Sequence, residues 1–126
     1  MRLLLDTHIL LWCLVDDAAL SPQARMQITD PANQIFMSSI SLWEIAIKVQ
    51  LGKLKGDVRE IRTAALASGF QPLPFSLDHA VAVAQLPGHH RDPFDRALIA
   101  QAQYEPLYLL THDHVLLAYG TTVILI

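Results

Sequence analysis

The sequence contains a single cysteine, so no disulfide framework can form within the chain. That residue, Cys13, lies in the apolar run 9–15, and we expect it to pack as a small hydrophobic side chain. No uninterrupted apolar stretch approaches the ~20 residues of a membrane span. The opening residues 1–5 are too short for an export signal before Asp6 interrupts them. These absences predict a cytoplasmic protein with no membrane segment.

The sequence also lacks an excess of positive charge, because nine Lys and Arg stand against twelve Asp and Glu. Proteins that bind nucleic acid non-specifically are usually basic, so a nucleic-acid substrate must be inferred from a site. With 52% apolar residues in a chain of 126, the protein can fill a core of its own. We therefore predict one folded domain over residues 1–126.

Short apolar runs alternate with helical patterns along the chain. Strands separated by helices pair in parallel and carry helices on both faces. We therefore predict an α/β fold with a mostly parallel central sheet of about four to five strands. The proline-broken strand is expected at a sheet edge. The predicted strands are residues 2–6, 34–37, 71–75, 107–111 and 121–126, and the predicted helices are residues 7–15, a segment starting at 21–22, residues 39 or 41 to 51, 57–69, 76–86 and 92–104.

Four acidic residues are expected near the carboxyl ends of these strands. Asp6 ends the first strand, and Glu44 is placed in the first turn of the helix that follows the second. Asp95 is placed in the first turn of the helix starting at 92–93, and Asp113 follows the fourth strand by two residues. Ligands of parallel sheets bind beyond these strand ends, so the four carboxylates are expected to converge. Mg²⁺ prefers such oxygen ligands and can activate water for phosphoryl chemistry.

Each acid also has a purely structural interpretation. Residues 41–44 fit a capping box, in which Glu44 would bond only to the backbone. Residues 92–95 fit an N-cap followed by an acid that the helix dipole favours. Asp113 can begin a turn, and Asp6 can cap the next helix. A carboxylate that directly continues three leucines is costly to bury without a partner, so Asp6 is the hardest to explain structurally.

Four sequence blocks occur in an order that resembles PIN domains, and among them the VapC-type toxins, the ribonuclease halves of toxin–antitoxin pairs. Taken singly the blocks are weakly specific, but four in order are highly specific. They span nearly the whole chain. The blocks are residues 3–8 (LLLDTH), 39–48 (SISLWEIAIK) with 52–54 (GKL), 90–102 (HRDPFDRALIAQA) and 110–113 (LTHD).

This resemblance implies a doubly wound α/β/α sandwich, dependence on Mg²⁺ or Mn²⁺, and endonucleolytic cleavage of RNA. It also implies a homodimer and a cognate antitoxin protein as partner. The acids that it assigns to catalysis and metal binding are Asp6, Glu44, Asp95 and Asp113. The residues that it suggests as supports are Thr7, Asp92, which we interpret as an N-cap, and Thr111, which would hold the loop of Asp113.

Histidines and basic residues have open interpretations. A zinc site built from 89–90 and 112–114 is disfavoured, because adjacent histidines usually point apart and no helical pair completes it. His90 and His112 can instead touch the substrate. The basic concentration Lys48, Lys53, Lys55, Arg59 and Arg62 is either a solvated surface or a contact for RNA or antitoxin.

The sequence pattern also predicts the surroundings of Arg96 and of the two tryptophans. Arg96 is expected on a different helix face from Asp95. Trp12 and Trp43 sit in apolar helical patterns and are interpreted as core or interface, not as platforms for bases. Two alternative functions stay open at this point: a non-catalytic PIN-like module that binds RNA or protein, and a metal-dependent phosphatase or DNA nuclease.

Overall fold

The computed structural model describes residues 1–126 and contains one five-stranded sheet. Every strand pair is parallel, and the order is β3-β2-β1-β4-β5. The predicted α/β class is confirmed, and the proline-containing strand does lie at an edge. The strands are β1 (Arg2–Leu5), β2 (Gln34–Ser38), β3 (Gln71–Leu73), β4 (Tyr108–Thr111) and β5 (Val123–Leu125).

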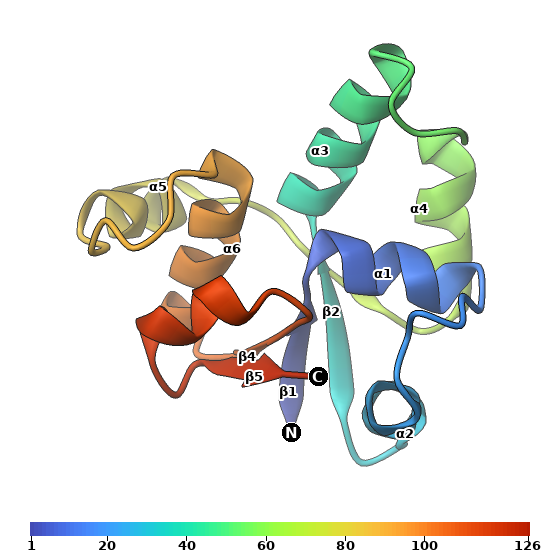
Figure 1. Ribbon diagram of the computed structural model, residues 1–126, viewed down its shortest axis with the longest axis horizontal. Helices are drawn as coiled ribbons and strands as arrows, with labels where there is room; N and C mark the ends of the chain where they lie inside the picture. The colour runs from blue at the N-terminus through green and yellow to red at the C-terminus, as the bar shows by residue number, and fades with distance from the viewer.

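Helices cover both faces of the sheet (Figure 1). Helices α1, α2 and α4 lie on one side, and α5, α6 and the short 3₁₀ helix η1 lie on the other. Ser21 and Asp57 cap their helices as their sequence contexts suggested. The helices are α1 (Thr7–Leu14), α2 (Pro22–Thr29), α3 (Ser39–Gln50), α4 (Val58–Ala67), α5 (Leu77–Ala84), α6 (Pro93–Tyr104) and η1 (His114–Tyr119).

The core consists of two apolar layers that the central strand separates. Leu3 and Leu5 pack with residues of α1, α2 and α4, whereas Leu4 packs with residues of α6 and η1. All three leucines are fully buried, because alternate side chains of a strand point to opposite faces. Strand β1 is therefore apolar throughout, as a strand covered on both faces must be.

The two tryptophans differ in burial. Trp12 is half-buried and packs against the first apolar layer, whereas Trp43 is 58% exposed, so for Trp43 only the interface interpretation stays a prediction. Cys13 packs against the first apolar layer as expected, although it is only half-buried. No helix of the structure has the length and apolar character needed to cross a membrane.

The carboxyl ends of the strands all lie at one edge of the sheet, because every strand pair is parallel. Strand β1 starts at the amino terminus, at the bottom of Figure 1, and runs up into α1. Because β1 and β4 are parallel neighbours in the register Leu5↔Leu110, the residues that follow them emerge side by side. Asp6 follows β1, and Asp113 follows β4 within two residues.

Candidate functional site

Asp6 is a buried carboxylate at the junction of β1 and α1. It caps α1, since one oxygen accepts the backbone N–H of Thr7 at 2.6 Å. The other oxygen accepts the hydroxyl of Thr111 at 2.5 Å. Burial raises the pKa of Asp6 above its ordinary value; the two hydrogen bonds oppose that shift, and the charge of Glu44 adds to it. Asp6 thus caps α1, and its carboxylate is poorly solvated, so that the charged form is disfavoured by burial.

Two threonine hydroxyls connect the elements around Asp6. The Thr111 hydroxyl donates to Asp6 and accepts the backbone N–H of Asp113 at 3.0 Å, so it fixes the turn after β4. The Thr7 hydroxyl donates to Ser41 at 3.0 Å and joins α1 to α3. Both threonines and Ser41 are buried. The structural part of Ser41 was missed in the sequence, where it appeared only as a helix cap.

Glu44 lies deeper in α3 than the sequence suggested. The helix begins at Ser39 with Ser38 as N-cap, so Glu44 sits in the second turn and the capping box over 41–44 is wrong. Its Oε2 lies 2.9 Å from the ammonium of Lys48, one turn further along α3. Its Oε1 is buried and has no hydrogen-bond donor. Since a buried unpartnered carboxylate oxygen is costly, this atom marks a position suited to a cation.

Asp92 and Asp95 open helix α6. Asp92 is the N-cap, as expected, and one of its oxygens accepts the N–H groups of Phe94 and Asp95 at 2.9 and 3.3 Å. The pKa of Asp95 is raised to about 8. Burial is the largest cause, followed by the negative charges of Asp6, Asp92, Glu44 and Asp113. Asp95 therefore lies within electrostatic reach of all the other acids.

Asp113 and His90 meet Asp95 in a compact group. Asp113 caps η1 through the N–H of Val115 at 3.0 Å. The Nε2 of His90 lies 3.1 Å from Asp95 Oδ2 and 3.5 Å from Asp113 Oδ2. One ligand-type atom from each of the three side chains lies within 4.8 Å of the others. Asp6 and Glu44 stand outside this group but close enough to repel Asp95.

A polar cavity of about 430 Å³ opens beside Asp6 and Asp113. Aromatic rings line its other side, with Trp12 edge-on to His112 at 5.2 Å between ring centroids. The Nδ1 of His112 lies 3.2 Å from the carbonyl of Ile126. His112 therefore borders the acidic site without contacting an acid, which is compatible with its predicted role toward a substrate.

Three basic residues near the site have different surroundings. Lys48 is paired with Glu44 and so belongs to the site. Lys53 is exposed in the turn that links α3 to α4. Arg96 points away from Asp95, as expected, and donates to the carbonyls of Pro87 and Val83 at 2.9 and 3.3 Å.

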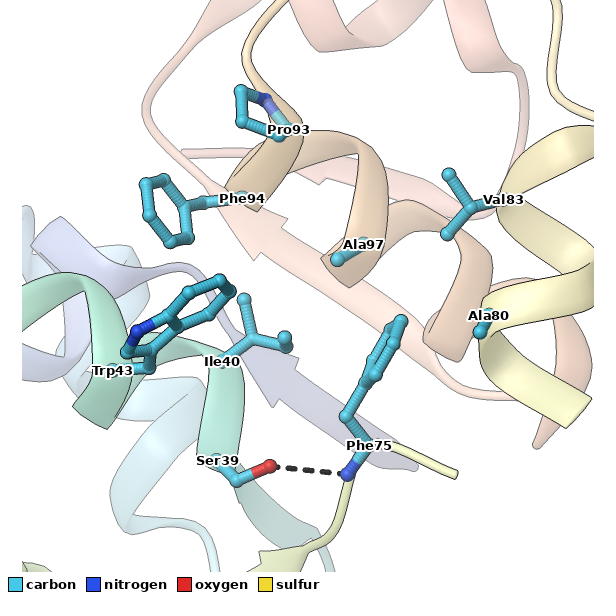
Figure 2. Close-up of a pocket in the computed structure, with 9 residues that line it drawn as sticks. All are labelled: Ser39, Ile40, Trp43, Phe75, Ala80, Val83, Pro93, Phe94 and Ala97. Atoms are coloured by element: carbon cyan, nitrogen blue, oxygen red, sulfur yellow. Dashed lines mark hydrogen bonds between the residues drawn. The ribbon is translucent and has the colours of Figure 1, made fainter. Parts of the chain in front are cut away.

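An apolar cavity of about 540 Å³ adjoins the acidic site between α3, α5 and α6 (Figure 2). Trp43 and Phe94, which immediately precede Glu44 and Asp95, pack edge to face at one side of the cavity with ring centroids 5.2 Å apart. Phe75 closes the lower side, where its N–H donates to the Ser39 hydroxyl at 3.0 Å. The acids and this cavity thus share two helices.

The family model for the PIN domain matches residues 3–120. No curated protein sequence matches the chain significantly. Among solved structures, the chain is similar to VapBC2 from Rickettsia felis bound to a DNA fragment from its promoter. The TM-score is 0.71 at 17% identity, covering 100% of this chain and 98% of that one.

Two further solved structures share the fold. A toxin–antitoxin complex from Klebsiella pneumoniae aligns at a TM-score of 0.67 and 22% identity, over 96% of this chain and 94% of that one. VapBC-5 from Mycobacterium tuberculosis, a member of the VapBC family of toxin–antitoxin systems, aligns at 0.59 and 26% identity, over 99% and 97%. These matches extend along the whole length of both chains.

The raised pKa of Asp95 makes the stability of the metal-free protein depend on pH. Between the ordinary value of 3.8 and about 8, the folded state holds a proton that the unfolded state releases. The free energy of unfolding should therefore fall as the pH rises through this window. Asp95→Asn mimics the protonated acid and should flatten the dependence and raise stability at pH 8. Urea unfolding in EDTA across the pH window, on both proteins, measures this. Parallel stability curves for the two proteins would contradict it.

Proposed function

The chain belongs to the PIN domain family, and on that premise we propose that it is a magnesium-dependent endoribonuclease, the toxin of a toxin–antitoxin pair. The observation that carries the proposal is the buried, donor-free oxygen of Glu44 beside Asp6 and Asp95. Nothing in a structural role for these acids requires that atom to be buried without a donor. A cation at the carboxyl edge of the sheet gives it a partner.

The donor set fits magnesium. Asp6, Glu44 and Asp95 offer carboxylate oxygens, the ligand type that Mg²⁺ takes, usually with water and substrate phosphate completing its shell. When bound, the ion supplies positive charge for the phosphate and makes a water-derived nucleophile accessible near neutral pH. The same oxygens suit Mn²⁺.

The other side chains of the site orient these ligands. Thr111 holds one oxygen of Asp6, and Lys48 holds one oxygen of Glu44. Each contact leaves the carboxylate with capacity to bind a cation, because a carboxylate accepts about four hydrogen bonds or metal contacts. Asp113 is turned toward Asp95 by the capping of η1 and by Thr111. We propose that Asp6, Glu44, Asp95 and Asp113 are the catalytic acids and that Thr7, Asp92 and Thr111 support them.

An RNA substrate is proposed from family membership and from the surroundings of the acids. His112 lines the open cavity next to Asp6, and aromatic rings, histidine among them, stack well on the unpaired bases of single-stranded RNA. Lys53 lies on the α3–α4 turn, where a phosphate backbone or an antitoxin can reach it. The overall negative charge of the chain limits non-specific attraction, so binding depends on these local contacts.

An antitoxin is proposed to occupy a second groove of about 450 Å³ between α1 and the α3–α4 hairpin. This groove shares His8 and Trp12 with the polar cavity beside the acids, so a bound segment can continue into the acidic site. An arginine of the segment would pair with the carboxylates through its planar guanidinium. It would thereby exclude the metal. The solved toxin–antitoxin complexes with this fold support such a partner.

A homodimer is proposed to form over the apolar cavity shown in Figure 2. Trp43 is 58% exposed at its edge, and on α5 Leu77 and Val81 are 88% and 63% exposed. Leu77 and Val81 lie one turn apart and so share a helix face. Large apolar side chains exposed together favour association.

Asp6→Asn should abolish metal-dependent cleavage of RNA while the protein stays folded. The asparagine keeps a capping oxygen but removes the charge that a metal needs. Because loss of even an outer partner of a metal ligand costs about 10–100-fold, we expect more than a ~100-fold loss in cleavage rate. Labelled RNA, DNA and a phosphomonoester should be tested with Mg²⁺, with EDTA as the metal-free reference.

Asp30→Asn is the matched control, because Asp30 is an exposed aspartate just before β2, at the opposite end of the sheet. It should cleave like the wild type. Cleavage of DNA in place of RNA would support a DNA nuclease, and cleavage of the phosphomonoester would support a phosphatase. RNA binding without any cleavage would support a non-catalytic module.

Val81→Glu should convert the protein to a monomer, since the charge would be buried against the partner copy. Light scattering should give twice the 14.0 kDa of one chain for the wild type and that single mass for the variant. Leu66→Glu is the control, because Leu66 is an exposed apolar residue on α4, across the sheet. A wild-type protein that is monomeric at micromolar concentration would exclude the dimer and leave the nuclease proposal untouched.

A further inference from the structure

The imidazole of His90 lies between two of the acids. Its Nε2 is within ion-pair distance of both Asp95 and Asp113, at 3.1 and 3.5 Å. The side chain is 22% exposed, against 16% for Asp95 and 37% for Asp113, so the contact lies at the rim of the cluster. The position resembles that of an ion bridging two carboxylates. Two oxygens on opposite sides of one Mg²⁺ are at most about 4.2 Å apart, twice the metal–oxygen distance. For comparison, the ligand atoms of Asp95 and Asp113 lie within 4.8 Å of each other.

The other nitrogen of the ring decides whether His90 can itself be a metal ligand. Nδ1 accepts the backbone N–H of Asp92 at 3.3 Å, so this nitrogen carries no hydrogen and the hydrogen of the neutral ring is on Nε2. An imidazole that ligates a metal through Nε2 has the reverse arrangement, with Nδ1–H donating to an oxygen. The geometry therefore directs an Nε2–H donor at the two acids.

The backbone, not the imidazole ring, fixes the place of His90. Its N–H donates to the Tyr119 hydroxyl at 3.1 Å, and its carbonyl accepts from Arg96 at 3.4 Å. Arg96 also donates to the Tyr119 hydroxyl at 3.3 Å and to the Pro87 carbonyl at 2.9 Å. Substitution of the His90 side chain leaves all these bonds available. The loop should thus keep its course in such variants.

Donors are distributed unevenly over the cluster. On the side of Asp113, Asp95 already faces the His90 ring. On the opposite side, the buried Oε1 of Glu44 has no donor at all, and the charges of Asp6 and Glu44 act directly on Asp95. One half of the cluster therefore has a buried oxygen without a donor, and the other half has an N–H donor between its two acids.

We propose that the His90 imidazole occupies the place between Asp95 and Asp113 where a second divalent ion would bridge them, so that the site takes one ion, on the Asp6–Glu44–Asp95 side. This inference rests on the proposed metal-dependent function. Two-metal nucleases place their ions ~3.5–4 Å apart to stabilise both the attacking and the leaving oxygen. Here His90 is a positioning residue that fills the place of the second ion and, through Nε2–H, holds Asp113 near Asp95.

Calorimetric titration with Mg²⁺ tests this by counting ions per chain. The wild type should bind one ion. His90→Ala should bind two, because the vacated space then lies between two carboxylates that have lost the Nε2–H donor. His89→Ala is the matched control, since His89 is an exposed neighbour in the same loop, and it should bind one.

Each other result overturns the inference in a distinguishable way. Two ions in the wild type would exclude the replacement by His90 but preserve the proposed nuclease. One ion in both the wild type and the folded His90→Ala variant would show that His90 does not limit the stoichiometry. No ion in the wild type would remove the metal-dependent function and this inference together.

A second measurement needs only the wild-type protein and so does not depend on the folding of a variant. The electron paramagnetic resonance spectrum with saturating Mn²⁺ should be that of a magnetically isolated ion. A spectrum of two coupled ions would contradict the single-ion site. A nitrogen coupling from a directly bound imidazole would make a histidine a ligand, which overturns the proposed role if the coupling disappears in His90→Ala.

Discussion

Repulsion among carboxylates at one edge of a parallel sheet is the constraint to which the rest of the site responds. Charges ~4 Å apart repel by about 4 kcal/mol at an effective dielectric near 20. Asp6, Asp95 and Asp113 stand at helix amino termini, whose partial positive charge favours an acid. Glu44 lies inside α3, beyond that help, and Lys48 pairs with it. The repulsion that these groups do not offset raises the pKa of Asp95. It also accompanies one buried oxygen of Glu44 that has no hydrogen-bond donor.

The layered architecture could be predicted because periodicity alone carries it. Three consecutive leucines before Asp6 fit only a strand buried on both faces, and Pro72 restricts its strand to an edge, where a missing N–H costs little. Capping residues such as Ser21 and Asp92 mark helix starts by local hydrogen bonding, which needs no knowledge of the rest of the chain. The convergence of Asp6 and Asp113 at one edge follows from parallel pairing.

The contacts within the site could not be predicted, since they join residues that only the tertiary structure brings together. The helix start at Ser39 depends on the Ser38 hydroxyl, so Glu44 moved from the expected first turn to the second. Tandem histidines suggested only that their rings diverge. The ring of His90 is oriented locally by the N–H of Asp92, but the position of its backbone depends on Tyr119, 29 residues further along the chain. The pair His89-His90 before the helix start at Asp92-Pro93 was the one sequence feature that pointed to a histidine near the acids. It did not indicate in which direction either ring points.

The central place of β1 in the sheet has a consequence for synthesis of the protein. Asp6 is made 105 positions before Thr111, the residue whose hydroxyl holds it. Strand β1 pairs with β2 along one edge, and its other edge can be paired only after β4 has been made. In a chain emerging from the ribosome, the acidic edge is therefore completed only after β4 and the turn that carries Asp113 have been made. A PIN domain with this strand order cannot assemble its acid cluster from the amino-terminal half of the domain alone.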